Sequence, residues 1–151
     1  MDRYKLWYSE SESHRNIVGI FMDEDLIRQI IEVMRVSDRL VIIKLVIKGF
    51  TLHMYSVYAS YVGLDKDVKA RFWEALDKVV RRVPRSDKII IVGDFNGHIG
   101  VLPGGYDDVH GVFGFGDRNG KGATLLDFAR AFRPVVVNSS FPKKKDHLIN
   151  F

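Results

Sequence analysis

The sequence contains no cysteine among its 151 residues, which excludes a disulfide framework and a thiolate metal site and fits a reducing compartment. Long hydrophobic runs are also missing. The longest, residues 40–47, is interrupted by Lys44 and falls well short of the roughly 18 residues of a membrane span. Internal repeats and low-complexity blocks are absent, and residues 1–16 hold no apolar segment of signal-peptide length. We therefore expect an intracellular chain, nuclear or cytoplasmic, that has no membrane partner.

The composition is that of a folded domain with a mild basic excess. Hydrophobic residues make up 46% and charged residues 28% of the sequence, a balance that argues against disorder. The length suits one domain with its own core, so we predict a single domain over residues 1–151. The formal net charge is +4 and the isoelectric point is near 9.3, which suits a polyanionic partner without identifying one.

Hydrophobic periodicity predicts an α/β fold. Strands are predicted at residues 16–22, 39–48, 51–59, 88–92 and 134–138. Helices are predicted at residues 23–34, 65–83 and 122–132. Asp23 is placed to cap the first helix, and the short gap at Gly49 and Phe50 predicts a hairpin. Hairpins mixed with βα units imply a mixed sheet covered by helices. The strand at residues 88–92 is apolar on both faces, so we predict that it is central in its sheet.

Polar residues follow this strand directly, in "IIIVGDFNGHIG" at residues 89–100. Ligand sites tend to lie at the carboxyl ends of strands, and Gly93 lets the backbone turn there. The carboxylate of Asp94 can accept a proton from water, and the amide of Asn96 can donate a hydrogen bond to an oxyanion. His98 adds a group that exchanges protons near neutral pH. Phosphodiester hydrolysis uses such groups, usually with a divalent ion.

The same residues have a plainer interpretation, in which Asp94 and Asn96 form an ordinary Asx turn after a strand. A calcium loop is excluded because its further oxygen ligands and terminal glutamate are missing. "GFGDRNGKG", residues 114–122, lacks the spacing of a phosphate loop, and the lysines at 143–145 are typical of a solvated run. Residues 97–122 hold nine of the thirteen glycines, so we expect a functional or mobile connection there.

Three segments together resemble the endonuclease/exonuclease/phosphatase superfamily, which has the DNase I-like fold. Residues 89–100 contain the G-D-F-N motif of that family. Residues 57–80, "VYASYVGLDKDVKARFWEALDKVV", are similar to its tyrosine-bearing strand and following helix. Residues 119–141 are similar to its downstream helix and strand. The sequence most resembles the branch of non-LTR retrotransposon endonucleases and craniofacial-development-protein-like sequences, over nearly the whole chain.

This resemblance implies a partial four-layer α/β sandwich with mixed sheets flanked by helices. It implies a hydrolase that uses magnesium or manganese to cleave phosphodiesters in nucleic acid, with DNA as the expected substrate. Asp94 would activate or orient water, while Asn96 and Tyr58 would contact the scissile phosphate. His98 would have a supporting role.

The sequence also departs from the family pattern. A metal-binding glutamate and an aspartate–histidine pair of the family have no counterpart here, His147 precedes the position of the family histidine, and Ser60 replaces a usual proline. We expect a truncated domain with exposed sheet edges that could self-associate, and weak or absent hydrolysis by the chain alone. Two alternatives remain open: a non-catalytic domain that binds nucleic acid or protein, and a phosphatase of lipid or inositol phosphates.

Overall fold

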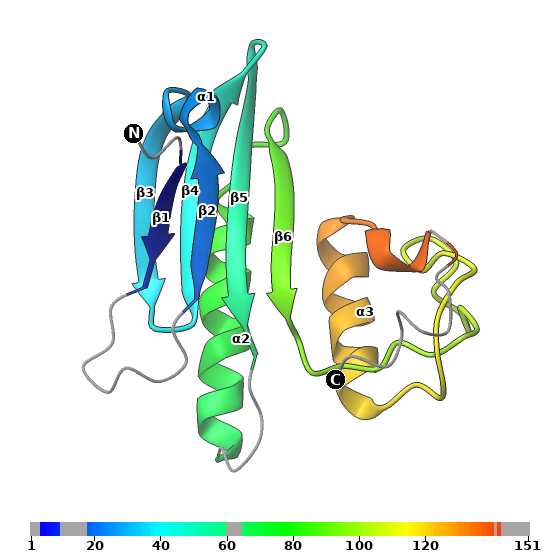
Figure 1. The fold of residues 1–151 in the computed structure, drawn as a ribbon. Coiled ribbons are helices and arrows are strands. Elements are labelled where there is room, and N and C mark those ends of the chain that lie inside the picture. The colour runs from blue at the N-terminus through cyan, green and yellow to red at the C-terminus, as the bar shows by residue number, and fades with distance from the viewer. Residues whose placement is uncertain (1–3, 10–17, 60–64, 141, 143–151) are drawn as a thin grey trace. The chain divides into compact units, whose positions relative to one another are not determined.

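The computed structural model describes residues 4–9, 18–59, 65–140 and 142. The chain divides into two compact units, Met1–Asp94 and Phe95–Phe151, and each is described separately (Figure 1). The chain contains both strands and helices, interspersed along the sequence, which confirms the predicted α/β class. In the described part of the chain, no helix has the length and apolar character needed to cross a membrane. The predicted single domain over residues 1–151 and the predicted four-layer sandwich stay predictions.

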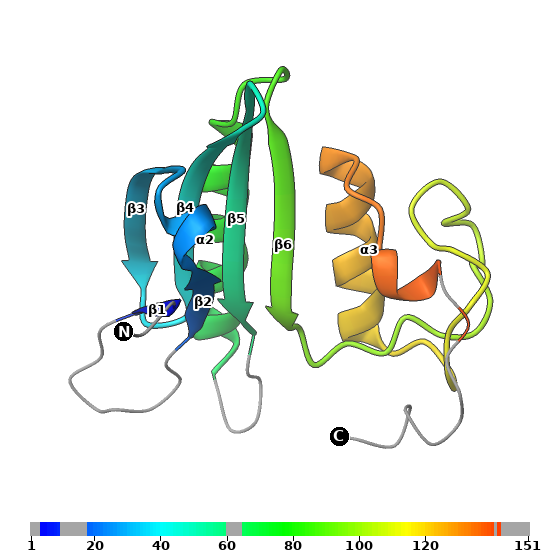
Figure 2. The same cartoon turned by 45° about the horizontal axis from the view of Figure 1, so that its top comes forward.

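The first unit contains two sheets. An antiparallel pair consists of β1 (Tyr4–Tyr8) and β2 (Gly19–Asp23). A mixed sheet has the order β3-β4-β5-β6, with bounds Ile30–Ser37, Leu40–Ile47, Phe50–Tyr58 and Lys88–Asp94. The first three strands of this sheet are antiparallel, and β6 runs parallel to β5. The helices of this unit are α1 (Glu24–Ile27) and α2 (Lys66–Arg81), and α2 lies along the mixed sheet (Figure 2).

The hairpin of β4 and β5 forms as predicted. Its turn residues Lys48 and Gly49 have φ angles of 48° and 82°. Two consecutive positive φ angles give a turn whose twist matches that of the flanking strands. The pairing runs without interruption from Leu40 opposite Val57 to Ile47 opposite Phe50, so side chains on each face stay in line across both strands.

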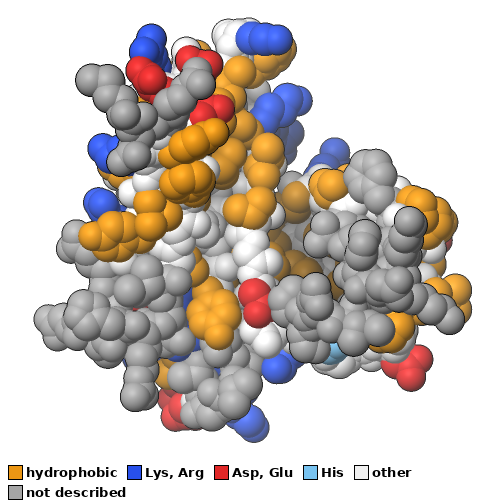
Figure 3. Space-filling model, in the orientation of Figure 1, with side chains coloured by type: hydrophobic (Ala, Val, Ile, Leu, Met, Phe, Trp, Pro, Cys, Tyr) orange, Lys and Arg blue, Asp and Glu red, His pale blue; other side chains and the backbone are white. Residues whose placement is uncertain are grey.

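Both faces of the mixed sheet carry packed elements. One face packs on β2 and forms a core of six buried residues, Val18, Ile20, Met22, Val41, Ile43 and Leu45. The Ser56 hydroxyl donates a hydrogen bond of 3.0 Å to the Gly19 carbonyl and ties the two sheets together. The other face carries Tyr55 and is covered by α2, whose buried residues are Phe72, Leu76 and Val80. The outer face of the small sheet is exposed and apolar, and it includes stacked Tyr4 and Phe21 rings 5.1 Å apart (Figure 3).

The second unit consists of α3 (Gly120–Phe132), a 3-10 turn η1 (Val137–Ser139) and a long loop. Val109, Leu126 and Ala129 form its core. Arg118 fixes the glycine-rich loop, because its guanidinium donates to the carbonyls of Ile99 at 3.0 Å and Leu102 at 2.8 Å. The loop therefore has a defined set of hydrogen bonds despite its many glycines.

Two predicted elements are wrong. The helix predicted at residues 23–34 is the short α1 followed by β3, although Asp23 does cap α1 by accepting a 2.9 Å bond from the Leu26 amide. The β-branched residues Ile30 and Val33 favour a strand, and pairing with β4 provides the partner. The strand predicted at residues 134–138 is a single bridge of Val136 to His110, followed by η1.

The predicted central position of β6 is also wrong. Among the described residues β6 pairs with β5 alone, so it is an edge strand of its sheet. Ile90 and Val92 on β6 are 44% and 46% exposed. An apolar sequence on both faces indicates a tendency to be buried, but it carries no information about which segment lies alongside.

Burial of Tyr55 makes the stability of the fold depend on pH in the alkaline range. The side chain is 1% exposed, and burial raises its pKa to about 12. A tyrosine of an unfolded chain ionises near pH 10, so the native state keeps a proton that the unfolded state loses. The stability linked to this proton is present below about pH 10 and is lost as the pH rises through about 12.

We therefore expect the free energy of unfolding, measured with urea at a series of alkaline pH values, to fall by up to about 2 kcal/mol in that range because of Tyr55. Tyr55→Phe should remove this part of the pH dependence while leaving the neutral-pH fold in place. Identical pH slopes for the wild type and Tyr55→Phe would contradict the assignment.

Candidate functional site

Tyr58 and Asp94 are the last residues of two neighbouring parallel strands. The register of β5 and β6 runs from Leu52 opposite Lys88 to Tyr58 opposite Asp94. The Ala59 amide donates a 2.8 Å hydrogen bond to the Asp94 carbonyl, so the ladder extends just beyond both residues. The structure thus brings two of the four candidate residues together at the carboxyl end of the sheet, where ligand sites of α/β folds commonly lie.

Gly93 permits this close pairing. Its φ is 152°, and a Cβ atom built on it would lie 1.9 Å from the Val57 carbonyl oxygen and 2.7 Å from Val57 Cγ2. No other residue fits between the strands without moving β5. The glycine of the G-D-F-N motif is therefore required by the packing of β6 on β5, one residue before the carboxylate.

Tyr58 and Asp94 have different surroundings. Tyr58 is half-buried, and its side chain packs against the apolar core between the two sheets. Its amide donates a 3.1 Å hydrogen bond to the Arg39 carbonyl. Asp94 is exposed at the strand end. The arrangement combines a tyrosine fixed by packing with a carboxylate that solvent can reach, which suits contacts with a polar ligand.

Asn96 and His98 belong to the second unit and follow Asp94 through Phe95. Asn96 is half-buried and has a positive φ of 49°, a conformation that asparagine tolerates better than most residues. His98 is exposed, and its backbone amide donates a 3.2 Å hydrogen bond to the side-chain oxygen of Asn119. The backbone amide of Asn119 in turn donates a 3.0 Å hydrogen bond to the His98 carbonyl. The backbone at His98 is therefore held at the beginning of α3.

Asn119 and Gly122 position this segment, and neither was predicted from the sequence to do so. The side-chain oxygen of Asn119 also accepts a 2.8 Å bond from the Gly122 amide and so caps α3. A Cβ atom on Gly122 would lie 1.9 Å from the His98 carbonyl oxygen, so the loop rests directly on the helix. An asparagine just before a helix is a recognisable cap, but no local pattern indicates that it also binds His98.

The residues described do not fit a divalent metal ion on their own. Within the described ranges, no three or more histidine, aspartate or glutamate side chains form a group that could hold a metal. Magnesium and manganese prefer about six oxygen ligands in a regular arrangement. Asp94 is the one carboxylate in residues 89–100, which is too few oxygen ligands to hold such an ion.

Comparison with known proteins finds similarity to craniofacial development protein 2 from Bos taurus and from Tragulus javanicus. Each is 28% identical to this chain over 149 residues, which is 97% of the chain. The chain spans about a quarter of the length of these curated relatives, 24% and 25%. No family model and no solved structure matches. The comparison confirms the resemblance to craniofacial-development-protein-like sequences and leaves the superfamily a prediction.

The packing at Gly93 predicts a large effect of a single methyl group. Gly93→Ala should lower the free energy of unfolding by at least about 3 kcal/mol, because the added Cβ collides with Val57 and the backbone is strained. Gly49→Ala is the matched control, since Gly49 also has a positive φ but has open space around it. It should cost about 1 to 2 kcal/mol. Equal losses for the two variants in urea unfolding would contradict the close approach of β6 to β5.

Proposed function

We propose that the chain is part of a phosphodiesterase domain that acts on nucleic acid, with DNA as the preferred substrate. In this proposal the chain alone binds the phosphodiester backbone and hydrolyses it weakly or not at all. The observation that carries the proposal is the pairing of Tyr58 with Asp94 at the ends of β5 and β6. The formal net charge of +4 supports a polyanionic partner.

Tyr58 and Asn96 have side chains suited to binding a phosphate, whereas Asp94 is suited to activating water. A tyrosine hydroxyl and the Asn96 amide can each donate a hydrogen bond to a phosphate oxygen. Asp94 cannot donate when ionised and repels a phosphate at short range. Its use near a phosphate is to orient or deprotonate the attacking water, as a general base does.

The arrangement of Tyr58, Asp94 and Asn96 lacks a positive charge to offset the negative charge that builds on the phosphate during hydrolysis. Attack of water on a phosphodiester builds negative charge that hydrolases offset with metal ions or arginine and lysine side chains. Asp94 adds to that negative charge instead of offsetting it. Removing part of a cooperating catalytic set costs several powers of ten in rate. This supports low activity of the chain alone and makes a non-catalytic nucleic-acid-binding domain the second candidate function.

A binding assay tests the phosphate contacts directly. We expect salt-sensitive binding of a fluorescent DNA duplex, followed by anisotropy in a buffer with EDTA. Tyr58→Phe should weaken binding about tenfold through loss of a hydrogen bond to a charged oxygen. Asp94→Asn should strengthen it about fivefold by removing repulsion of about 1 kcal/mol. Asp107→Asn, an exposed aspartate of the second unit, is the control for general charge and should have a smaller effect.

A nicking assay on supercoiled plasmid with magnesium or manganese tests the reaction. We expect no more nicking by the wild type than by Asp94→Asn. Nicking that requires both Asp94 and the metal would contradict the low activity. If Asp94→Asn and Tyr58→Phe bind DNA as the wild type does, the proposed site itself is wrong.

A further inference from the structure

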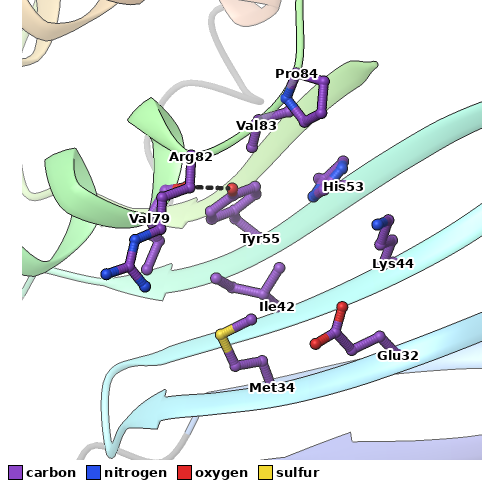
Figure 4. Close-up of a pocket in the computed structure, with 10 residues that line it drawn as sticks. All are labelled: Glu32, Met34, Ile42, Lys44, His53, Tyr55, Val79, Arg82, Val83 and Pro84. Atoms are coloured by element: carbon purple, nitrogen blue, oxygen red, sulfur yellow. Dashed lines mark hydrogen bonds between the residues drawn. The ribbon is translucent and has the colours of Figure 1, made fainter. Parts of the chain in front are cut away.

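A pocket of about 280 Å³ lies within the first unit, between the mixed sheet and the end of α2 (Figure 4). It opens on the sheet face that carries Tyr55, whereas Tyr58 lies on the opposite face and packs toward the β1–β2 sheet. The pocket is therefore separate from the strand-end site, and a proposal about it does not rest on the proposed function.

The pocket floor consists of two rows of side chains that cross the sheet. Glu32, Lys44 and His53 lie directly opposite one another on β3, β4 and β5 and form a polar row. Met34, Ile42 and Tyr55 form the next row and are apolar apart from the tyrosine hydroxyl. The two rows share one face because residues two apart in a strand point the same way. Val79, Arg82, Val83 and Pro84 line the pocket from the α2 side.

His53 is fixed by a partner at the edge of the pocket. Its Nε2 atom lies 2.9 Å from Asp87 Oδ2, and both side chains are 12% exposed. An ionised carboxylate only accepts, so Nε2–H is the donor. This bond is the main cause that holds the pKa of Asp87 below its ordinary value, and Lys44 adds a smaller electrostatic contribution.

Glu32 and Lys44 are neighbours of opposite charge whose side chains stay available to a ligand. In the described part of the chain, neither side chain makes a hydrogen bond or an ion pair within 4.0 Å. Figure 4 shows both side chains rising from adjacent strands beside the apolar row. The pocket thus offers one anion, Glu32, two cations, Lys44 and Arg82, and an apolar surface within a small volume.

We propose that this pocket binds a small zwitterion with an apolar body, namely a free α-amino acid with an apolar side chain. Lys44 would bind the carboxylate and Glu32 the ammonium group. The apolar side chain would lie on Met34, Ile42 and Tyr55 beneath Val79 and Val83. The volume is near the lower end of small-molecule sites, roughly 300 Å³, which suits an amino acid.

The arrangement discriminates by charge. A ligand that has a carboxylate and no amine offers no positive charge to Glu32. A ligand that has an amine and no carboxylate offers no negative charge to Lys44. The first therefore leaves Glu32 unpaired and the second leaves Lys44 unpaired, so each gains one charge-assisted bond instead of two.

Three matched probes test this inference by NMR titration of the whole chain: L-leucine, isocaproate, which lacks the amine, and isoamylamine, which lacks the carboxylate. Leucine should cause saturable shifts of amide resonances in β3, β4 and β5 around the pocket. The other two should bind at least about tenfold more weakly. Absence of leucine binding, or equal binding of isocaproate or isoamylamine, overturns the proposal.

Variants test the two charged contacts. Lys44→Gln and Glu32→Gln should each weaken leucine binding at least about tenfold. Lys66→Gln at the far end of α2 and Glu74→Gln on its exposed side are matched controls and should bind leucine as the wild type does. Far-UV circular dichroism checks that each variant is folded. Unchanged leucine affinity in either pocket variant would contradict the assigned contacts.

Discussion

The close parallel contact of β6 with β5 is the constraint on which the candidate site depends. Gly93 leaves room for the Val57 carbonyl, and the register that follows places Asp94 opposite Tyr58. A side chain at position 93 would separate the strands at their carboxyl ends, where the Ala59 amide still bonds to the Asp94 carbonyl. The arrangement of the two polar side chains is thus a consequence of backbone packing.

Strand β5 serves two different surfaces because its side chains alternate. Tyr58 points to the side of the β1–β2 sheet, where a shared apolar core holds it. Tyr55 points to the side of α2 and forms part of the pocket floor. The two residues therefore lie on opposite faces of the strand, and the phosphate-binding and amino-acid-binding proposals can fail or succeed independently.

Local signals in the sequence predicted the β4–β5 hairpin, α2, α3 and the cap at Asp23, since each depends on neighbouring residues. The helix predicted from Ile30 and Met34 failed because their spacing fits a helix and a strand, and pairing with the distant β4 decides between them. The position of β6 at an edge and the bond of Asn119 to His98 depend on contacts between segments far apart in sequence. Tyr58 was assigned to the site by resemblance to a family, because no local sequence pattern around it predicts that it lies beside Asp94.

The paired ends of β5 and β6 hold Tyr58 beside Asp94. The most direct measurement is a nuclear Overhauser experiment combined with hydrogen exchange of the amides. We expect a cross-peak between the Ala59 amide proton and the Asp94 α proton, together with slow exchange of the Ala59 amide. Absence of the cross-peak with fast exchange at Ala59, while amides in the centre of β4 stay protected, would contradict it.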